Sequence, residues 1–94
     1  MEKELEERIR NVKVGDPIVY HDPVGKAHNA ICTANWGMCI NFVYVSSDES
    51  KTDQYGRQIE RQTSMSHASA NNVHGFYWRF LDEEPNPYKP PVSI

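Results

Sequence analysis

The sequence has no long apolar run and no excess of positive charge, and each absence excludes a class of protein. The 94 residues contain no apolar stretch near the ~20 residues of a membrane-spanning helix. No charged segment followed by an apolar run opens the chain, so we expect a cytoplasmic protein with no membrane contact. The formal net charge is −3, whereas proteins that bind nucleic acid usually carry excess basic residues. We therefore do not expect nucleic acid as a partner.

The sequence also lacks the motifs of common metal sites and active sites. None of the four histidines stands at a recognised ligand spacing, and no Cys-x-x-Cys pair occurs. No Gly-x-Ser-x-Gly turn surrounds a serine, and Gly56 stands alone in its loop, so no glycine-rich turn can hold a phosphate. We expect no metal, no cofactor and no enzymatic activity.

Cysteine is scarce, with only two residues in the chain. Cys32 and Cys39 flank the turn Asn35-Trp36-Gly37, where a disulfide across a hairpin is conceivable. Both also stand in apolar, strand-like segments, in which a free thiol packs as a small hydrophobe. We expect two free thiols, which suits a cytoplasmic protein.

A short helix is expected at the start of the chain. Leu5, Ile9 and Val12 recur at spacings of four and three, which predicts an amphipathic helix within residues 1–13. A helix of this length is not stable alone in water. Its apolar face must therefore lie on the rest of the domain or on a neighbouring subunit.

Five short strands are expected next, at residues 18–21, 26–36, 38–45, 57–67 and 76–81. The third is the most apolar, with Phe42 and Tyr44 on one face and Val43 and Val45 on the other. Such a strand must be covered on both faces, which small proteins commonly achieve by curling the sheet into a barrel. The Asp-Pro-Val-Gly sequence at 22–25 is typical of a type I turn.

The strand pattern resembles an SH3-like small barrel, because it opens with Val14-Gly15-Asp16-Pro17 and ends in an aromatic strand. The length allows one domain over residues 1–94. We expect a mainly β fold with a helix over 1–13, a five-stranded SH3-like barrel over 14–81 and an extended tail over 82–94. Prolines 85, 87, 90 and 91 exclude helix and inner strand from that tail.

The chain also resembles small, poorly characterised proteins of tailed bacteriophages over about residues 14–80. The segments that carry the resemblance are 14–17, Tyr20-His21-Asp22-Pro23, Val43-Tyr44-Val45-Ser46-Ser47, the run from Asp53 to Arg61, and His74-Gly75-Phe76-Tyr77-Trp78-Arg79. The resemblance implies a phage origin, and hence the cytoplasm of an infected bacterium. Some small phage proteins sequester nucleotide signals of host immunity and others are parts of the virion. The resemblance does not choose between them and brings no catalytic residues.

Candidate ligand-binding residues gather around the polar loop after the third strand. Arg57 and Arg61 are expected on one face of the fourth strand, where two forked guanidinium groups suit a phosphate or carboxylate. Aromatic rings would stack on a base, and hydroxyls would add hydrogen bonds. The candidate residues are Ser47, Thr52, Tyr55, Arg57, Arg61, Ser66, His67, Tyr77 and Trp78.

Each group in this set has a structural alternative. The arginines can be exposed strand residues paired with nearby acids, where they contribute little. His67 can cap a turn. Trp78 is expected to share one strand face with Phe76 and Phe80, and that face can instead close the core, which leaves Tyr77 and Arg79 pointing the other way.

These residues favour a non-enzymatic phage protein that binds and sequesters a small anionic ligand, such as a nucleotide or a cyclic nucleotide immune signal. The alternative is a structural or adaptor protein of the virion head or tail that acts through protein contacts. A binder of single-stranded nucleic acid is the third alternative, and the negative net charge makes it the least favoured of the three. We also expect a homo-oligomer. A barrel this small cannot cover all of the remaining apolar surface. That surface comprises the apolar face of the helix and three residues of the tail, Tyr88, Val92 and Ile94.

Overall fold

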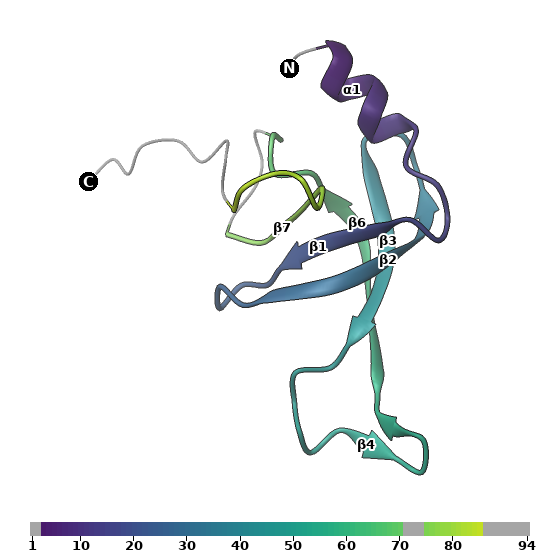
Figure 1. Ribbon diagram of the computed structural model, residues 1–94, viewed down its shortest axis with the longest axis vertical. Coiled ribbons are helices and arrows are strands. Elements are labelled where there is room, and N and C mark those ends of the chain that lie inside the picture. Colours follow the sequence, from purple (N-terminus) through teal and green to yellow (C-terminus); the bar gives the residue numbers. More distant parts are fainter. Residues whose placement is uncertain (1–2, 71–74, 86–94) are drawn as a thin grey trace, which may run out of the picture.

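The structure is a computed structural model that describes residues 3–70 and 75–85. It is mainly β, as predicted (Figure 1). One helix, α1 (Lys3–Arg10), precedes the strands β1 (Pro17–His21), β2 (Ala27–Asn35), β3 (Cys39–Val45), β4 (Thr52–Asp53), β5 (Gly56–Arg57), β6 (Ile59–Ser66) and β7 (Tyr77–Arg79). The expected tail over 82–94 lies beyond the described residues from position 86 onward.

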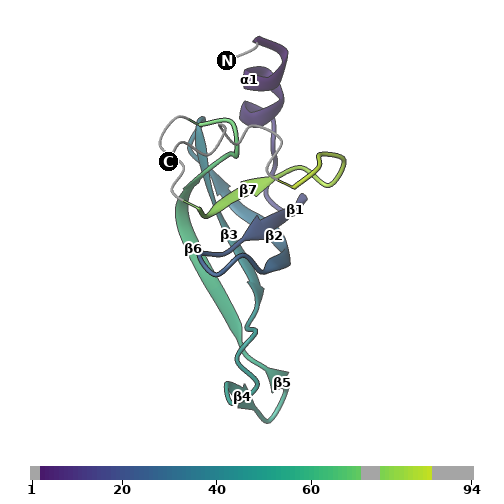
Figure 2. The same cartoon turned by 90° about the vertical axis from the view of Figure 1, so that its left-hand side faces the viewer.

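Five of the strands form one antiparallel, strongly curved sheet in the order β6-β3-β2-β1-β7, a half-barrel (Figure 2). The last strand, β7, pairs with the first, so the two edges of the sheet approach each other. They meet at a single bridge between His67 and Trp78, where the amide of Ala68 donates to the carbonyl of Trp78 at 3.0 Å. The β1–β2 turn forms where predicted, with the amide of Gly25 donating to the carbonyl of Asp22 at 2.9 Å.

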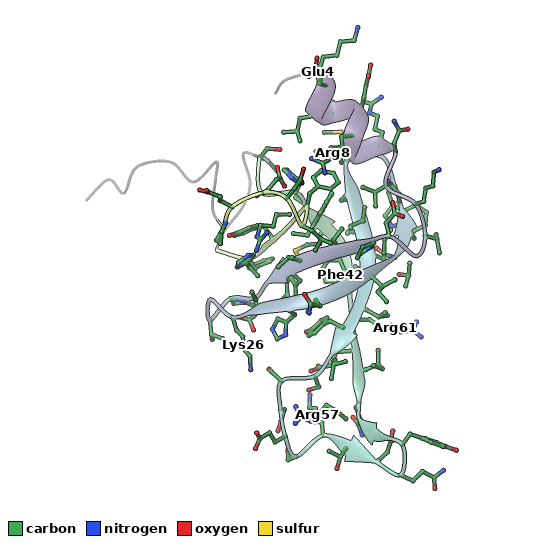
Figure 3. The ribbon with its side chains drawn as sticks, viewed as in Figure 1. Glu4, Arg8, Lys26, Phe42, Arg57 and Arg61 are labelled. Carbon is green, nitrogen blue, oxygen red and sulfur yellow. The ribbon has the colours of Figure 1, made fainter. Side chains whose placement is uncertain are left out.

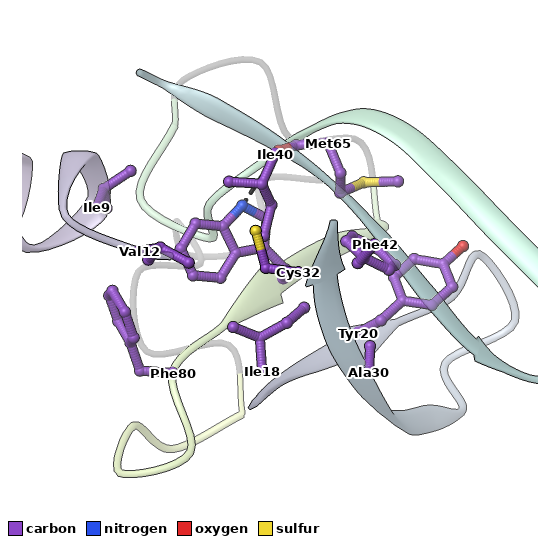
Figure 4. Close-up of a cluster of buried hydrophobic side chains, with 11 residues drawn as sticks. Ile9, Val12, Ile18, Tyr20, Ala30, Cys32, Ile40, Phe42, Met65 and Phe80 are labelled. Atoms are coloured by element: carbon purple, nitrogen blue, oxygen red, sulfur yellow. Dashed lines mark hydrogen bonds between the residues drawn. The ribbon is translucent and has the colours of Figure 1, made fainter. Parts of the chain in front are cut away.

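The core fills the concave side of this sheet (Figure 4). Alternate residues of the central strands point inward, because successive side chains of a strand face opposite sides. Phe42 and Trp78 are both fully buried, and the Trp78 indole Nε1 donates to the carbonyl of Met65 at 3.1 Å. The core comprises Ile9, Val12, Ile18, Tyr20, Ala30, Cys32, Ile40, Phe42, Met65, Trp78 and Phe80.

Helix α1 packs on the sheet of its own chain. This is one of the two expected arrangements, the other being packing on a neighbouring subunit. Ile9 is fully buried, Val12 is 6% exposed and Leu5 packs at the edge of the core. Asn35, at the end of β2, holds the end of the helix. Its Nδ2 donates to the carbonyls of Ile9 and Val12, each at 2.9 Å. Carbonyls at the end of a helix accept hydrogen bonds from outside its regular repeat, so this one side chain joins the end of the helix to the sheet.

Three expectations about the strands need correction. The predicted fourth strand, 57–67, is interrupted at Gln58, and the segment before it forms a separate two-stranded ribbon of β4 and β5. Phe76 does not close the core with Trp78 and Phe80, since it is 39% exposed. Neither does Tyr77 point to solvent, because it is 3% exposed beneath His21.

The central strand is covered on one face only among the described residues. Phe42 is buried on the concave side, but Val45 on the convex side is 53% exposed. The expectation that the barrel covers both faces is wrong, because curling a single sheet buries its inner surface and leaves the outer one to solvent.

The two cysteines are free thiols, as predicted. Cys32 is fully buried in the core, and burial raises its pKa, so it packs as a neutral small hydrophobe. Cys39 is half-buried at the start of β3.

Candidate functional site

The nine candidate residues do not form one site. Four of them, Ser47, Thr52, Tyr55 and Arg57, lie on an exposed loop and ribbon over residues 46–58, here called the finger. Ser66, His67, Tyr77 and Trp78 lie at the opposite part of β6 and on β7, where they are buried or half-buried. Arg61 stands between the two groups on β6. The finger and helix α1 project from opposite ends of the molecule (Figures 1 and 2).

The finger is held in shape by its own hydrogen bonds. The amide of Ser46 donates to the carbonyl of Gln58, and the amide of Gln58 donates to the carbonyl of Lys51, both at 2.9 Å. The amide of Asp48 donates to the Ser46 hydroxyl at 3.1 Å, although Ser46 itself is 1% exposed. That hydroxyl also donates to the Glu60 carboxylate and holds the pKa of Glu60 below its ordinary value.

Tyr55 at the tip of the finger is the most exposed aromatic side chain of the described chain, at 89%. The turn beneath it is fixed by its own amide, which donates to the Asp53 carboxylate at 2.8 Å. Gly56 follows with a φ of +117°, a backbone conformation that favours glycine. Local sequence therefore presents this ring to solvent on a defined turn.

Arg57 forms a hydrogen bond that stabilises the base of the finger. Its Nη1 donates to the carbonyl of Ser46 at 2.9 Å, so part of its fork is used within the chain. The expectation that Arg57 and Arg61 share a face is wrong, because the break at Gln58 interrupts the two-residue alternation on which it rested. The two side chains project to opposite sides of the chain (Figure 3).

Arg61 is the candidate residue that remains available. It lies on the convex face of β6, opposite Val43 of β3, and it is exposed. Its guanidinium makes no hydrogen bond or ion pair with the rest of the described chain that would occupy the fork. An anion or a carboxylate of another molecule can therefore reach it.

His67 belongs to a buried polar network at the closed end of the sheet. It is 1% exposed, its Nδ1 accepts from the amide of Ser69 at 3.1 Å, and its Nε2 lies 2.8 Å from Glu83 Oε1. The same carboxylate oxygen accepts from the amide of Phe80 at 2.8 Å. Burial lowers the pKa of His67, opposed by Glu83. The neutral ring thus ties the chain after β7 to the end of β6.

The same residues have the composition of a Ser-His-Glu triad, with the Ser69 hydroxyl 2.9 Å from His67 Nδ1. A nucleophilic serine must meet substrate while its base stays in reach. Here Ser69 is only two residues from His67, and its own amide donates to the nitrogen that would act as base. This geometry is that of a turn capped by a histidine, which was the structural alternative for His67.

A second buried network surrounds Tyr77. Its ring stacks on His21 with centroids 4.7 Å apart, and His21 Nε2 accepts from Arg79 Nε at 2.9 Å. Burial, and next the nearby Arg79 charge, lower the pKa of His21. Arg79 Nη1 also donates to the carbonyl of Glu83 at 2.6 Å. Tyr77 and Trp78 are thus closing elements of the sheet and do not present a stacking surface.

The convex face of β2, β3 and β6 carries a feature that the candidate list missed. Ile31, Val43 and Arg61 stand opposite one another across the three strands, and Val45 and Ile59 form the next row toward the finger. Ile31, Val45 and Ile59 are 50%, 53% and 59% exposed, and Val43 is half-buried. We call these four aliphatic residues with Arg61 the outer face. The signal in the sequence was the two-sided apolar pattern of β3.

Within residues 3–70 and 75–85 no three metal-binding side chains come together. In the same part of the chain, no helix has the length and apolar character that crossing a membrane requires. Comparisons with protein-family models, with curated proteins and with solved structures found no match for this chain.

Proposed function

We propose that this chain is a non-enzymatic protein-binding module, an adaptor that docks a partner protein on its outer face. The observation that carries the proposal is the exposed aliphatic surface of the outer face on β2, β3 and β6. Exposed apolar patches of this kind mark interaction sites. The core lies on the opposite, concave face of the same strands. The aliphatic residues of the outer face therefore contribute nothing to the core of the fold.

The partner surface should be flat, apolar and acidic at one point. Arg61 lies in the row with Ile31 and Val43, and a buried guanidinium at an interface needs a carboxylate that matches its fork. A stable interface covers about 800 Å² on each partner, more than four aliphatic side chains provide. The finger begins directly after the Val45–Ile59 pair and supplies the remaining area. Because it is internally bonded, it loses little conformational entropy on docking.

The SH3-like identity and the phage origin are part of the same proposal. Four antiparallel neighbours in chain order, with the last strand returning beside the first, agree with the strand order of an SH3-like barrel. A virion adaptor, in the head or the tail, is the setting in which we place a small barrel with an uncovered outer face.

A photoreactive side chain at position 59 tests the proposal directly. We expect one discrete cross-linked protein in the cells that make the chain, and we expect Val45→Glu to abolish it because the charge cannot be desolvated in an apolar contact. A photoreactive side chain at position 24 is the control, since Val24 is 88% exposed in the β1–β2 turn. Equal cross-linking from positions 59 and 24, or no effect of Val45→Glu, would contradict the proposal.

Nucleotide sequestration is a second candidate function, favoured by the exposed and available guanidinium of Arg61. A phosphate bound there would lie over an aliphatic surface, with Tyr55 on the finger as the exposed aromatic ring. We rank it second because Arg57 is engaged with Ser46 and the rings of Tyr77 and Trp78 are buried.

A further inference from the structure

A groove of about 500 Å³ lies between the end of helix α1 and the turn that follows β7. Its floor is apolar and is formed by Val12, Ile18 and Phe80, all of them buried core residues. Leu81 at its rim is 55% exposed. Helix α1 and the segment after β7, which line this groove, lie at the end of the molecule away from the finger (Figure 1).

The charges around the groove are acidic on balance. Arg8 is already neutralised, because its Nη2 lies 2.8 Å from Asp82 Oδ1 and its guanidinium carbon stands 3.8 Å from the centre of the Phe80 ring. Asp16 is the second carboxylate in the lining, and it accepts from the amide of Lys13 at 2.9 Å. An apolar floor with one carboxylate left unpaired by a cation of the described chain, that of Asp16, suits an extended, apolar segment that carries a single positive charge.

We propose that this groove binds the C-terminal segment, residues 86–94, of a second copy of the chain. Lys89 is the only charged side chain of that segment, and the others include three prolines together with Tyr88, Val92 and Ile94. Nine residues in a polyproline II conformation reach about 28 Å at ~3.1 Å per residue. A proline-rich segment is also stiff before binding, so docking costs little conformational entropy.

The path of the chain favours a second copy over the same molecule. Asp82 lines the groove, but the next residue is fixed elsewhere, since the Glu83 carboxylate binds His67 and its carbonyl accepts from Arg79. Pro85 then restricts Glu84 to an extended conformation. The described chain therefore leaves its own groove directly after Asp82, and we infer that residues 86–94 fit the groove of a neighbour.

Light scattering on the full chain at concentrations up to ~1 mM tests this assignment. We expect self-association of the wild type, weakened at least about tenfold by Leu81→Glu in the groove and by Tyr88→Glu in the tail. Val24→Glu, the same kind of change at an exposed site away from the groove, should associate like the wild type. A synthetic peptide with the sequence of residues 84–94 should dissociate the wild-type assembly.

Mixing the two weakened variants identifies the second copy. The Leu81→Glu chain keeps a sound tail and the Tyr88→Glu chain keeps a sound groove, so an equimolar mixture should form a 1:1 pair of about twice the 10.8 kDa chain mass. A wild type that is monomeric throughout, a mixture that stays monomeric, or variants that associate unchanged would each overturn the assignment. If only Ile59→Glu disrupts the assembly, the copies meet through the outer face and the groove is not involved.

Discussion

Replacing Asn35 should weaken the attachment of helix α1 to the sheet, and the size of the effect follows from the hydrogen bonds of this side chain. The side-chain Nδ2 donates to the carbonyls of Ile9 and Val12 at 2.9 Å, and Oδ1 accepts from the amide of Gly37 at 2.7 Å. At about 1 kcal/mol of net stability per neutral hydrogen bond, three bonds amount to ~3 kcal/mol. Asn35 is half-buried, so water recovers part of this. We expect Asn35→Ala to lower the free energy of unfolding by ~2–3 kcal/mol.

The isosteric change Asn35→Asp is the sharper form of this test. It keeps the oxygen that Gly37 uses but replaces the donor by a second carboxylate oxygen, which then faces two carbonyls at the negative end of a helix. Asn35→Asp should therefore destabilise the protein at least as much as Asn35→Ala. If side-chain volume were what mattered, the order would be reversed.

Equilibrium unfolding in denaturant measures both variants by tryptophan fluorescence. The main change in signal should come from Trp78, which is fully buried, since Trp36 is already 65% exposed in the folded chain. For a domain of this size each 1 kcal/mol shifts Tm by ~4–8 °C, so a fall of roughly 10–20 °C should accompany the change. Asn29→Asp is the matched control, because Asn29 is exposed in the same strand and should stay within about 0.5 kcal/mol of wild type. An Asn35→Asp protein as stable as this control would refute the reasoning.

Two further predictions concern the histidines and Arg61. Burial lowers the pKa values of both His21 and His67 from 6.5, so below that pH the unfolded chain binds more protons than the folded one. The denaturant midpoint should therefore be lower at pH 5.5 than at pH 7.5. Equal midpoints would show that the two rings are not held neutral in the folded protein. If a nucleotide binds beside Arg61, calorimetry should show Arg61→Ala weakening it roughly ten- to a hundredfold, with Arg61→Lys recovering part. Arg57→Ala should act on finger stability instead, and no heat with any nucleotide would remove this candidate.

Local patterns in the sequence were sufficient to predict most of the elements. The spacing of Leu5, Ile9 and Val12 predicted α1, and the Asp-Pro-Val-Gly sequence predicted the turn that joins β1 to β2. The five strands of the sheet lie within two residues of their expected positions at all of their ends. These features depend on neighbours within a few residues, which is the range over which periodicity and turn preference act.

The candidate site failed where it relied on longer-range geometry. The shared face for Arg57 and Arg61 assumed an unbroken strand, but the hydrogen bonds between Ser46, Lys51 and Gln58 turn the chain aside at position 58. No residue at 58 announces that break, because glutamine is compatible with a strand. Likewise, the partnership of Asn35 with the end of α1 joins residues 23 to 26 positions apart, and Asn35 reads in sequence as an ordinary turn residue.

The prediction that aromatic rings form a stacking surface failed for a different physical reason. A chain of this length buries a smaller fraction of its surface than a large protein does, so its core depends on large side chains. Trp78, Phe42 and Tyr20 serve that purpose, and Tyr77 stacks on His21 where the sheet closes. Rings that would form a stacking platform in a larger protein are used here for stability. This need for large core side chains does not explain the outer face, because the aliphatic residues on the convex side fill no part of the core. Their presence on three adjacent strands is therefore the observation on which the proposed contact with another molecule rests.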